Sequence, residues 1–282
     1  MSEKKISDNM MTRIISGACL TIITIVCNYF GGPLLLFVLL ACSLIGLYEF
    51  FRATSVLKQG KRITPVTAAA YLFTVVYYLF LYIWNDAEHL LFVIVSMIVV
   101  TMMVYVFTFP KLHAGQIAYC VFGFVYVPVL LSFIYRVREL ENGIYTVWLI
   151  YIASWVCDTF AYLTGMAIGR HKLAPVLSPK KSIEGAVGGI LGSALAGFLF
   201  AYFLLEKQMQ GVTAGIVIVC AVCAVVSQTG DLAASAIKRN HAIKDYGNLI
   251  PGHGGILDRF DSVIFTAPMI YFLLVFLVHG GF

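Results

Sequence analysis

The stretch IPGHGGILDRFDS, residues 250–262, gathers glycines, a histidine, an arginine and two aspartates near the end of the chain. Asp258 and Asp261 lie three residues apart, so on a helix both carboxylates point to the same side. Oxygen ligands of this kind suit a hard cation such as Mg²⁺, which keeps several waters and is completed by substrate phosphates. The glycines within residues 251–255 allow a ligand to approach the backbone closely. The stretch therefore predicts a metal-assisted reaction on a substrate that carries phosphate.

The segment SQTGDLAASAIKRN, which precedes this stretch, has polar residues at helical spacing. If the preceding helix continues through it, Asp231, Ser235 and Lys238 fall at positions i, i+4 and i+7, with Arg239 beside them. One helix face would then present a carboxylate, a hydroxyl and a cation. The loop that follows adds two charged residues, Lys244 and Asp245.

A third polar segment is RHKLAPVLSPKKSIEGAVGG, in which Lys180 and Lys181 lie between Ser178 and Ser182. Pro179 early and Glu184 just inside the start suit a helix N-terminus with a capping arrangement. A helix N-terminus beside lysines is an anion site, and phosphate is its natural ligand. The alternative is that these lysines only set the topology and attract anionic lipid headgroups.

Asp158 lies inside the otherwise apolar stretch SWVCDTFAYLTGMAIGR. A carboxylate within a membrane is costly, so it should face a cavity, a cation or a basic partner. Tyr162 and Gly165 follow at i+4 and i+7 and share its helix face, which favours a role for Asp158 in the site or in support of it. A structural hydrogen bond or ion pair between helices is the alternative.

The composition tells which elements must position these residues. Hydrophobic residues make up 61% of the 282 and charged residues 12%, with a mean hydropathy of +0.92, which is typical of an integral membrane protein. Continuous apolar runs of 17 or more residues predict helices and not barrel strands. We therefore expect an all-α, polytopic transmembrane bundle of about nine helices, near residues 14–30, 34–51, 66–84, 90–109, 115–135, 144–169, 186–205, 211–230 and 262–279.

The polar residues divide the chain by function. Residues 1–143 are expected to supply transmembrane helices without chemistry, and residues 144–282 a catalytic transmembrane domain. Along the helix near 186–205, small residues recur every four positions, which permits close helix packing. The sequence leaves open whether this packing occurs within one chain or across a homodimer. The small residues form two ladders with four-residue spacing: Gly188, Gly192 and Ala196, and Gly185, Gly189, Ser193 and Gly197.

The positions of lysine and arginine predict the orientation. With a cytoplasmic N-terminus, only Arg136, Arg138 and Lys207 fall on the far side, which leaves 16 of the 19 basic residues inside. The formal net charge of +5 is explained by this asymmetry and needs no nucleic acid. No transit segment is recognisable, so we expect a bacterial plasma (inner) membrane with the active site facing the cytoplasm.

The segment SAIKRNHAIKDYGNLIPGHGGILDRFD, residues 235–261, resembles over its whole length the signature of the phosphatidate cytidylyltransferases, also called CDP-diacylglycerol synthases. The preceding GDLAAS and the upstream SPKKSIEG are also similar to that family. The resemblance covers roughly residues 150–282, while the N-terminal helices match only in being hydrophobic.

The resemblance implies transfer of the cytidylyl group from CTP to phosphatidic acid, which gives CDP-diacylglycerol and pyrophosphate in phospholipid biosynthesis. It implies a two-cation centre, Mg²⁺ with K⁺, held by Asp231, Asp258 and Asp261, and it assigns phosphate and nucleotide binding to lysines and serines. The residues expected to be catalytic are Lys238, Asp258 and Asp261. Those expected to bind substrate are Ser178, Lys180, Lys181, Ser182, Ser235, Arg239, Lys244, His253, Gly254 and Arg259, with Asp158 and Asp245 in support.

Two alternatives remain at this point. A CTP-dependent polyprenol-type lipid kinase would use the same lysines and metal, but it would pass on the terminal phosphate. A transporter would use Asp158 and Asp231 as coupling sites, although transport sites usually lie at the bilayer midplane between repeats. No internal repeat is visible in this chain.

Overall fold

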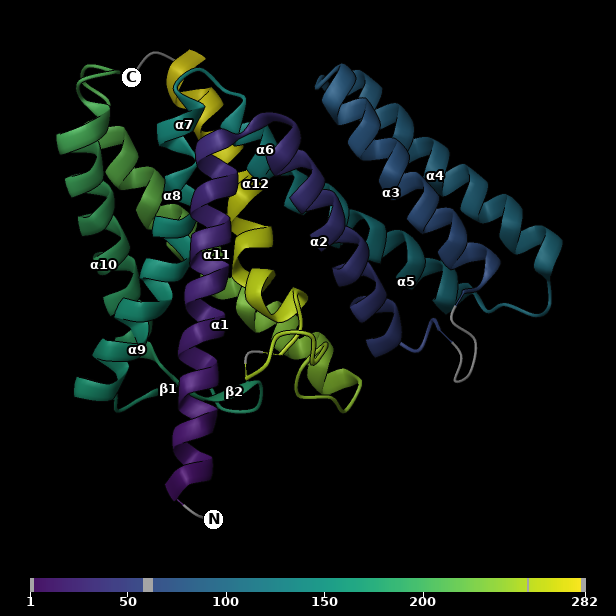
Figure 1. Cartoon of the computed structure of the whole chain (residues 1–282), viewed down its shortest axis with the longest axis horizontal. Coiled ribbons are helices and arrows are strands. Elements are labelled where there is room, and N and C mark those ends of the chain that lie inside the picture. The colour runs from purple at the N-terminus through teal and green to yellow at the C-terminus, as the bar shows by residue number, and fades with distance from the viewer. Residues whose placement is uncertain (1–2, 58–62, 253, 280–282) are drawn as a thin grey trace. The chain divides into compact units, whose positions relative to one another are not determined.

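The computed structural model describes residues 3–57, 63–252 and 254–279, and it is almost entirely helical (Figure 1). The helices of the first part of the chain are α1 (Glu3–Phe30), α2 (Gly32–Ala53), α3 (Pro65–Ile83), α4 (Ala87–Thr108), α5 (Ala114–Phe124), the π-helical turn η1 (Val125–Val129) and α6 (Leu130–Arg138). Those of the second part are α7 (Gly143–Thr146), α8 (Trp148–Tyr151), the π-helical turn η2 (Ile152–Val156), α9 (Cys157–Ile168), α10 (Ile183–Phe200), the π-helical turn η3 (Ala201–Leu205), α11 (Thr213–Asn240) and α12 (Leu257–His279). Two short strands, β1 (Lys172–Ala174) and β2 (Ser178–Ser182), lie between α9 and α10.

The polytopic helical architecture expected from the sequence is confirmed. In the described residues, eight helical segments are long and apolar enough to cross a membrane, and Ile14–Phe30 of α1 is a shorter apolar segment. Each of the nine predicted segments coincides with one of these. The chain is thus an integral membrane protein, and its first two helices are joined at Gly31 and Gly32, whose positive φ angles of 62° and 49° suit glycine.

The chain separates into two compact units. The first unit comprises Met1–Tyr135 and Ile243–Arg259, and the second comprises Arg136–Ala242 and Phe260–Phe282. Helices α6 and α12 each begin in the first unit and end in the second. The division by function expected at 143/144 stays a prediction, and the compact units follow a different boundary because residues 243–259 belong with the N-terminal helices.

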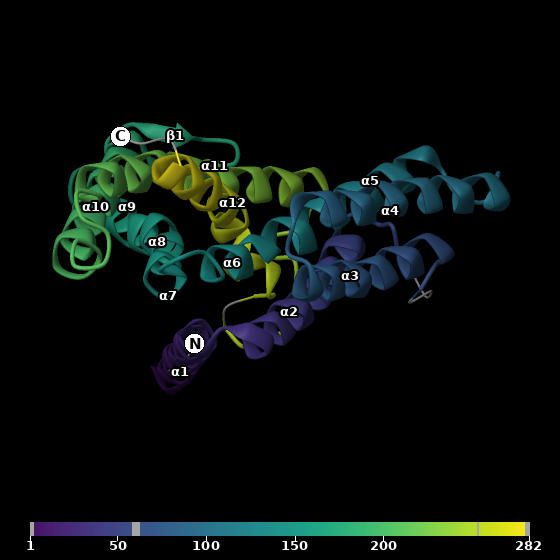
Figure 2. The ribbon, with the colours of Figure 1, turned by 90° about the horizontal axis from the view of Figure 1, so that it is seen from above.

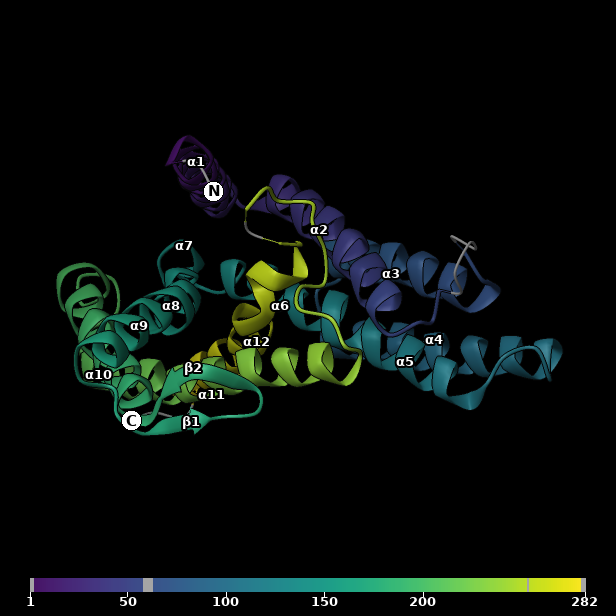
Figure 3. The ribbon, with the colours of Figure 1, turned by 90° about the horizontal axis from the view of Figure 1, so that it is seen from below.

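In the first unit, α2, α3, α4 and α5 pack against one another, and α3 and α4 run side by side (Figures 1 and 2). Aromatic rings fill the interior of this unit, and Phe50, Tyr77 and Phe124 are at most 1% exposed. The segment that joins α11 to α12 runs along α2 (Figure 3). This packing places a polar loop against an apolar transmembrane helix.

In the second unit, α10 packs closely against α9 and α11 (Figure 2). A Cβ atom at Gly188 would collide with Thr164, and one at Gly192 would collide with the ring of Phe160. Ser193 Oγ donates to a carbonyl oxygen of the neighbouring helix, Cys220 O, at 3.3 Å. The small-residue ladder therefore packs within one chain, and the homodimer stays a prediction.

Residues 172–182, within the third polar segment, form a β-hairpin that the sequence did not predict. Strands β1 and β2 are antiparallel, with Lys172 opposite Ser182 and Ala174 opposite Ser178. The predicted helix is present, and Glu184 lies in its first turn, but it begins only at Ile183 with Ser182 as its cap, so Pro179 belongs to β2 and not to the helix start. Ser182 Oγ accepts a hydrogen bond from the Gly185 N–H at 3.1 Å.

Candidate active site

The hairpin and the start of α10 present the predicted lysines on an ordered strand. Lys180 and Lys181 belong to β2, directly before the Ser182 cap. The carboxylate of Glu184 accepts hydrogen bonds from the backbone N–H groups of Arg170 (3.1 Å) and His171 (3.2 Å). It therefore ties the start of the hairpin to the first turn of α10. The result is a fixed helix N-terminus flanked by two ammonium groups, which is suited to an anion.

Asp158 faces this hairpin from α9. The π-helical turn η2 directly precedes α9, and such turns occur frequently at functional sites. Asp158, Tyr162 and Gly165 all line one cavity, so the helix face predicted from their spacing is confirmed.

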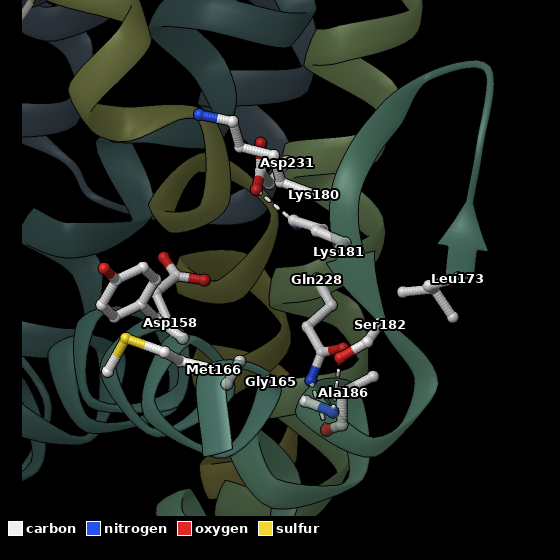
Figure 4. Close-up of a pocket in the computed structure, with 13 residues that line it drawn as sticks. Asp158, Gly165, Met166, Leu173, Lys180, Lys181, Ser182, Ala186, Gln228 and Asp231 are labelled. Carbon is white, nitrogen blue, oxygen red and sulfur yellow. Dashed lines mark hydrogen bonds and ion pairs between the residues drawn. The ribbon is translucent and has the colours of Figure 1, made fainter. Parts of the chain in front are cut away.

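The cavity in the second unit has a volume of about 330 Å³. Its walls come from α9, from the hairpin with the start of α10, and from α11 (Figure 4). Asp158 lies on one side and the strand with Lys180, Lys181 and Ser182 on the other. The cavity brings together residues that were singled out from separate stretches of the sequence.

Lys181 and Asp231 form an ion pair between β2 and α11 (Figure 4). Their side chains are 27% and 26% exposed, so the pair is partly shielded from water. Gln228, one turn before Asp231, donates from Nε2 to the carbonyl oxygen of Ala186 at 3.0 Å. It fixes α11 against α10 at the cavity wall, and no motif in the sequence had indicated it.

Further along the same face, Lys238 is 8% exposed and Asp261 is half-buried. Asp261 lies within electrostatic range of Asp231, Lys238 and Asp158. The carboxylate of Asp261 thus experiences the charges of two other carboxylates and of a buried ammonium group of the second unit. Like charges that influence one another are stabilised by a cation or a basic partner, and Lys238 is such a partner for Asp261.

The donor set suits a hard divalent cation, because it consists of carboxylate oxygens. Among residues 3–57, 63–252 and 254–279, however, no group of three or more His, Cys, Asp or Glu side chains lies close enough to hold an ion. Within this part of the chain, Lys181 supplies the positive charge beside Asp231. A cation that binds Asp231 must therefore compete with that ammonium group.

In the first unit, Asp258 is buried at 5% exposure and is held by backbone groups. Its Oδ2 accepts hydrogen bonds from the N–H of Tyr246 at 2.8 Å, of Gly255 at 3.0 Å and of Gly247 at 3.4 Å. This single oxygen therefore binds backbone N–H groups near the start and near the end of the loop. The position of Asp258 depends on the backbone at residues 246, 247 and 255.

The loop also lines a polar cavity of about 340 Å³ in the first unit. The predicted residues Lys244, Asp245, Gly254 and Arg259 all contribute to its lining. Arg259 Nε is buried and makes no hydrogen bond in the described part of the chain. A guanidinium group beside a lysine suits an anion such as a phosphate or a carboxylate.

The remaining predicted residues lie as follows. Ser178 stands at the start of β2, Ser235 and Arg239 lie on α11, and none of the three belongs to the described linings of the two cavities. His253 falls outside the described residues. Besides Gln228, a second polar residue was not predicted from the sequence, because no chemistry was expected before residue 144. Glu49 on α2 is 3% exposed and accepts hydrogen bonds from the loop at Ile256 and Leu257.

Comparison with known proteins identifies the family of this chain. Three similar proteins named phosphatidate cytidylyltransferase each align over 158 residues, which is 56% of this chain and 59% of the relative. They come from Staphylococcus aureus strain COL at 37% identity, Staphylococcus epidermidis at 39% and Staphylococcus saprophyticus at 35%. The chain thus spans less than two thirds of the length of the relatives it matches. The model of the cytidylyltransferase family matches residues 11–277, nearly the whole sequence. The chain therefore belongs to the cytidylyltransferase family.

Proposed function

We propose that this protein transfers the cytidylyl group from CTP to phosphatidic acid, giving CDP-diacylglycerol and pyrophosphate. The observation that carries the proposal is the cavity of the second unit. There, Lys180 and Lys181 and the capped start of α10 face the carboxylates of Asp158 and Asp231. Nucleotidyl transfer needs cations for the phosphates and carboxylates for a metal, since its barrier falls mainly through positioning and charge neutralisation. The printed name of the similar staphylococcal proteins supports the same reaction.

In the proposed reaction, an oxygen of the phosphatidate monoester attacks the α-phosphorus of CTP in line. A new phosphorus–oxygen bond forms while the bond to the oxygen that bridges to the β-phosphate breaks, and pyrophosphate leaves. Lys180 and Lys181 offset the charge on the leaving group, and the start of α10 orients it. A phosphate monoester, with a second pKa of about 6, is largely ionised at neutral pH, so the attack requires no protein base.

A bound Mg²⁺ would polarise the α-phosphate and offset negative charge in the transition state. Asp231 and Asp261 would hold this cation, with K⁺ as the second cation that the resemblance implies. Asp258 remains the predicted third ligand because of its spacing from Asp261 along α12. The triphosphate offers Lys181 a new partner, so its arrival would release Asp231 for the metal.

We further propose that the protein lies in a bacterial plasma membrane with its site facing the cytoplasm. The support is the distribution of basic residues, of which only Arg136, Arg138 and Lys207 fall on the far side. CTP is a cytoplasmic metabolite, and phosphatidic acid would enter from the surrounding lipid.

The deciding experiment uses purified protein in detergent with phosphatidic acid, Mg²⁺ and CTP labelled at either the α- or the γ-phosphate. We expect the α label in the lipid with release of pyrophosphate, and loss of this transfer in Asp258→Asn. The exposed Glu88→Gln, in the first turn of α4, is the matched control and should keep full activity. Entry of the γ label into the lipid would mean a kinase, and no transfer of either label by folded protein would refute the proposal.

A further inference from the structure

Glu49 is a carboxylate inside a transmembrane helix and takes no part in the reaction proposed above. It is 3% exposed, and a carboxylate in such a place persists only with close partners. Its Oε1 accepts a hydrogen bond from the Ile256 N–H at 3.1 Å, and its Oε2 accepts one from the Leu257 N–H at 2.9 Å. Both oxygens are therefore used to hold the backbone of the loop where α12 begins.

The loop is shaped to fit this carboxylate. A Cβ atom at Gly247 or at Gly255 would collide with Glu49, so both positions admit only a glycine at this separation. Arg52, three residues further along α2, donates from Nη2 to the carbonyl oxygen of Tyr246 at 2.7 Å. One face of α2 thus holds the loop at two points far apart in the loop's own sequence.

The backbone held in this way is the same backbone that holds Asp258. The N–H groups of Tyr246, Gly247 and Gly255 donate to Asp258 Oδ2, and the next two N–H groups, of Ile256 and Leu257, donate to Glu49. The two carboxylates therefore bind adjacent N–H groups in residues 255–257. A shift of residues 255–257 away from α2 would move Asp258 with it.

We propose that Glu49, assisted by Arg52, is a positioning residue that sets the orientation of Asp258. As far as catalysis is concerned, this inference rests on the proposed function, in which Asp258 serves the metal. Groups that orient a ligand without touching the metal typically change metal affinity or activity by about 10- to 100-fold when removed. In Glu49→Gln, one oxygen becomes an NH₂ group that faces a backbone N–H, so one of the two hydrogen bonds is replaced by repulsion between donors.

The first measurement is hydrogen exchange of the full-length protein in detergent without substrate. We expect the amides of Tyr246 and of residues 255–257 to exchange about tenfold faster in Glu49→Gln, as follows from losing a hydrogen bond to a charged group. The matched control is Ser43→Ala, on the same helix and fully buried, whose Oγ lies 2.8 Å from the Tyr78 hydroxyl. It removes a buried hydrogen bond of α2 without touching the loop, so these amides should exchange at the wild-type rate.

The second measurement is Mn²⁺ binding by calorimetry, followed by the Mg²⁺ concentration that gives half-maximal activity. We expect Glu49→Gln to weaken Mn²⁺ binding and to raise the Mg²⁺ requirement by about tenfold or more, with a smaller change in the KM for CTP. Ser43→Ala should change neither. If Glu49→Gln does not fold, Arg52→Lys carries the test, because it keeps the charge but loses the Nη2 donor, and we expect about threefold effects.

The outcomes separate this inference from the proposed function. Unchanged amide exchange in Glu49→Gln would refute the anchoring, and faster exchange with unchanged Mn²⁺ binding would reduce Glu49 to a purely structural role. Exchange and Mn²⁺ binding are measured without turnover, so they decide the inference even if wild-type protein transfers no cytidylyl group.

Discussion

Lys181 of β2 and Asp231 of α11 form an ion pair at the wall of the cavity in the second unit. Each belongs to a different predicted function, since the lysine is expected to bind phosphate and the aspartate a metal. The pair therefore links the two kinds of ligand. A metal at Asp231 and a phosphate at Lys181 would each have to compete with this pair, and a nucleotide that drew Lys181 away would leave Asp231 to the metal.

The variant Lys181→Met should separate the role of this lysine in phosphate binding from its effect on metal binding at Asp231. The KM for CTP should rise about tenfold, because a hydrogen-bonded cation is lost from the phosphate site. Binding of Mn²⁺ in the absence of nucleotide should become tighter, because Asp231 loses its internal counter-ion. Steady-state kinetics and calorimetry check the two effects, with the exposed neighbour Lys180→Met as control. That control should raise the KM without changing Mn²⁺ binding, and an unchanged Mn²⁺ affinity in Lys181→Met would contradict the linkage.

Removal of the metal should abolish the reaction. When Mg²⁺ is added back, variants of Asp231 and Asp158 should differ in how much activity they recover. After treatment with EDTA, wild-type activity should be restored by Mg²⁺. Asp231→Asn should lose more than about 100-fold in activity at any Mg²⁺ concentration, because a direct ligand is lost. Asp158→Asn should need about 10- to 100-fold more Mg²⁺ but recover, as a supporting group would. Titration of activity against Mg²⁺ distinguishes these cases, and equal behaviour of the two variants would contradict the assignment.

The features that could be predicted from the sequence depend on local patterns. Apolar runs located each long apolar helix of the described residues. The spacing of Asp158, Tyr162 and Gly165 identified a cavity wall, because helix periodicity alone decides which residues share a face. Glu184 was predicted to lie at a helix start, and it lies in the first turn of α10.

The features that escaped prediction depend on contacts between distant parts of the chain. Glu49 bonds to backbone groups 207 and 208 residues away, and nothing beside it in the sequence marks those partners. The one local indication of Glu49 was a charged residue within an apolar run, which is also the feature from which a role for Asp158 was predicted. The hairpin of β1 and β2 was missed because its strands are short and polar, so their pairing depends on the surrounding helices.

Close packing of α10 on α9 predicts that Gly192→Ala is destabilising. The added methyl group would overlap the ring of Phe160, and such overpacking typically costs about 1–3 kcal/mol. We expect the midpoint of thermal unfolding in detergent to fall by about 2–10 °C. Gly115→Ala is the matched control, since a methyl group there meets nothing within 4 Å. Equal midpoints for the two variants would contradict the close approach of these helices.

The loop between η3 and α11 should make a contribution to stability that depends on pH. Hydrogen bonds from the Thr213 hydroxyl and from the Gly211 N–H, the latter at 2.7 Å, lower the pKa of Glu206 below its ordinary value of 4.5. A carboxylate with a lowered pKa stabilises the folded state above its unfolded pKa, and this effect is lost as the pH falls through the folded value. Wild type should therefore unfold at a higher temperature than Glu206→Gln at pH 7, and the difference should shrink as the pH falls below about 4.5. Thermal unfolding of both proteins between about pH 7 and pH 3 measures this. A difference that stays constant over the range would show that the ionised carboxylate is not what stabilises the loop.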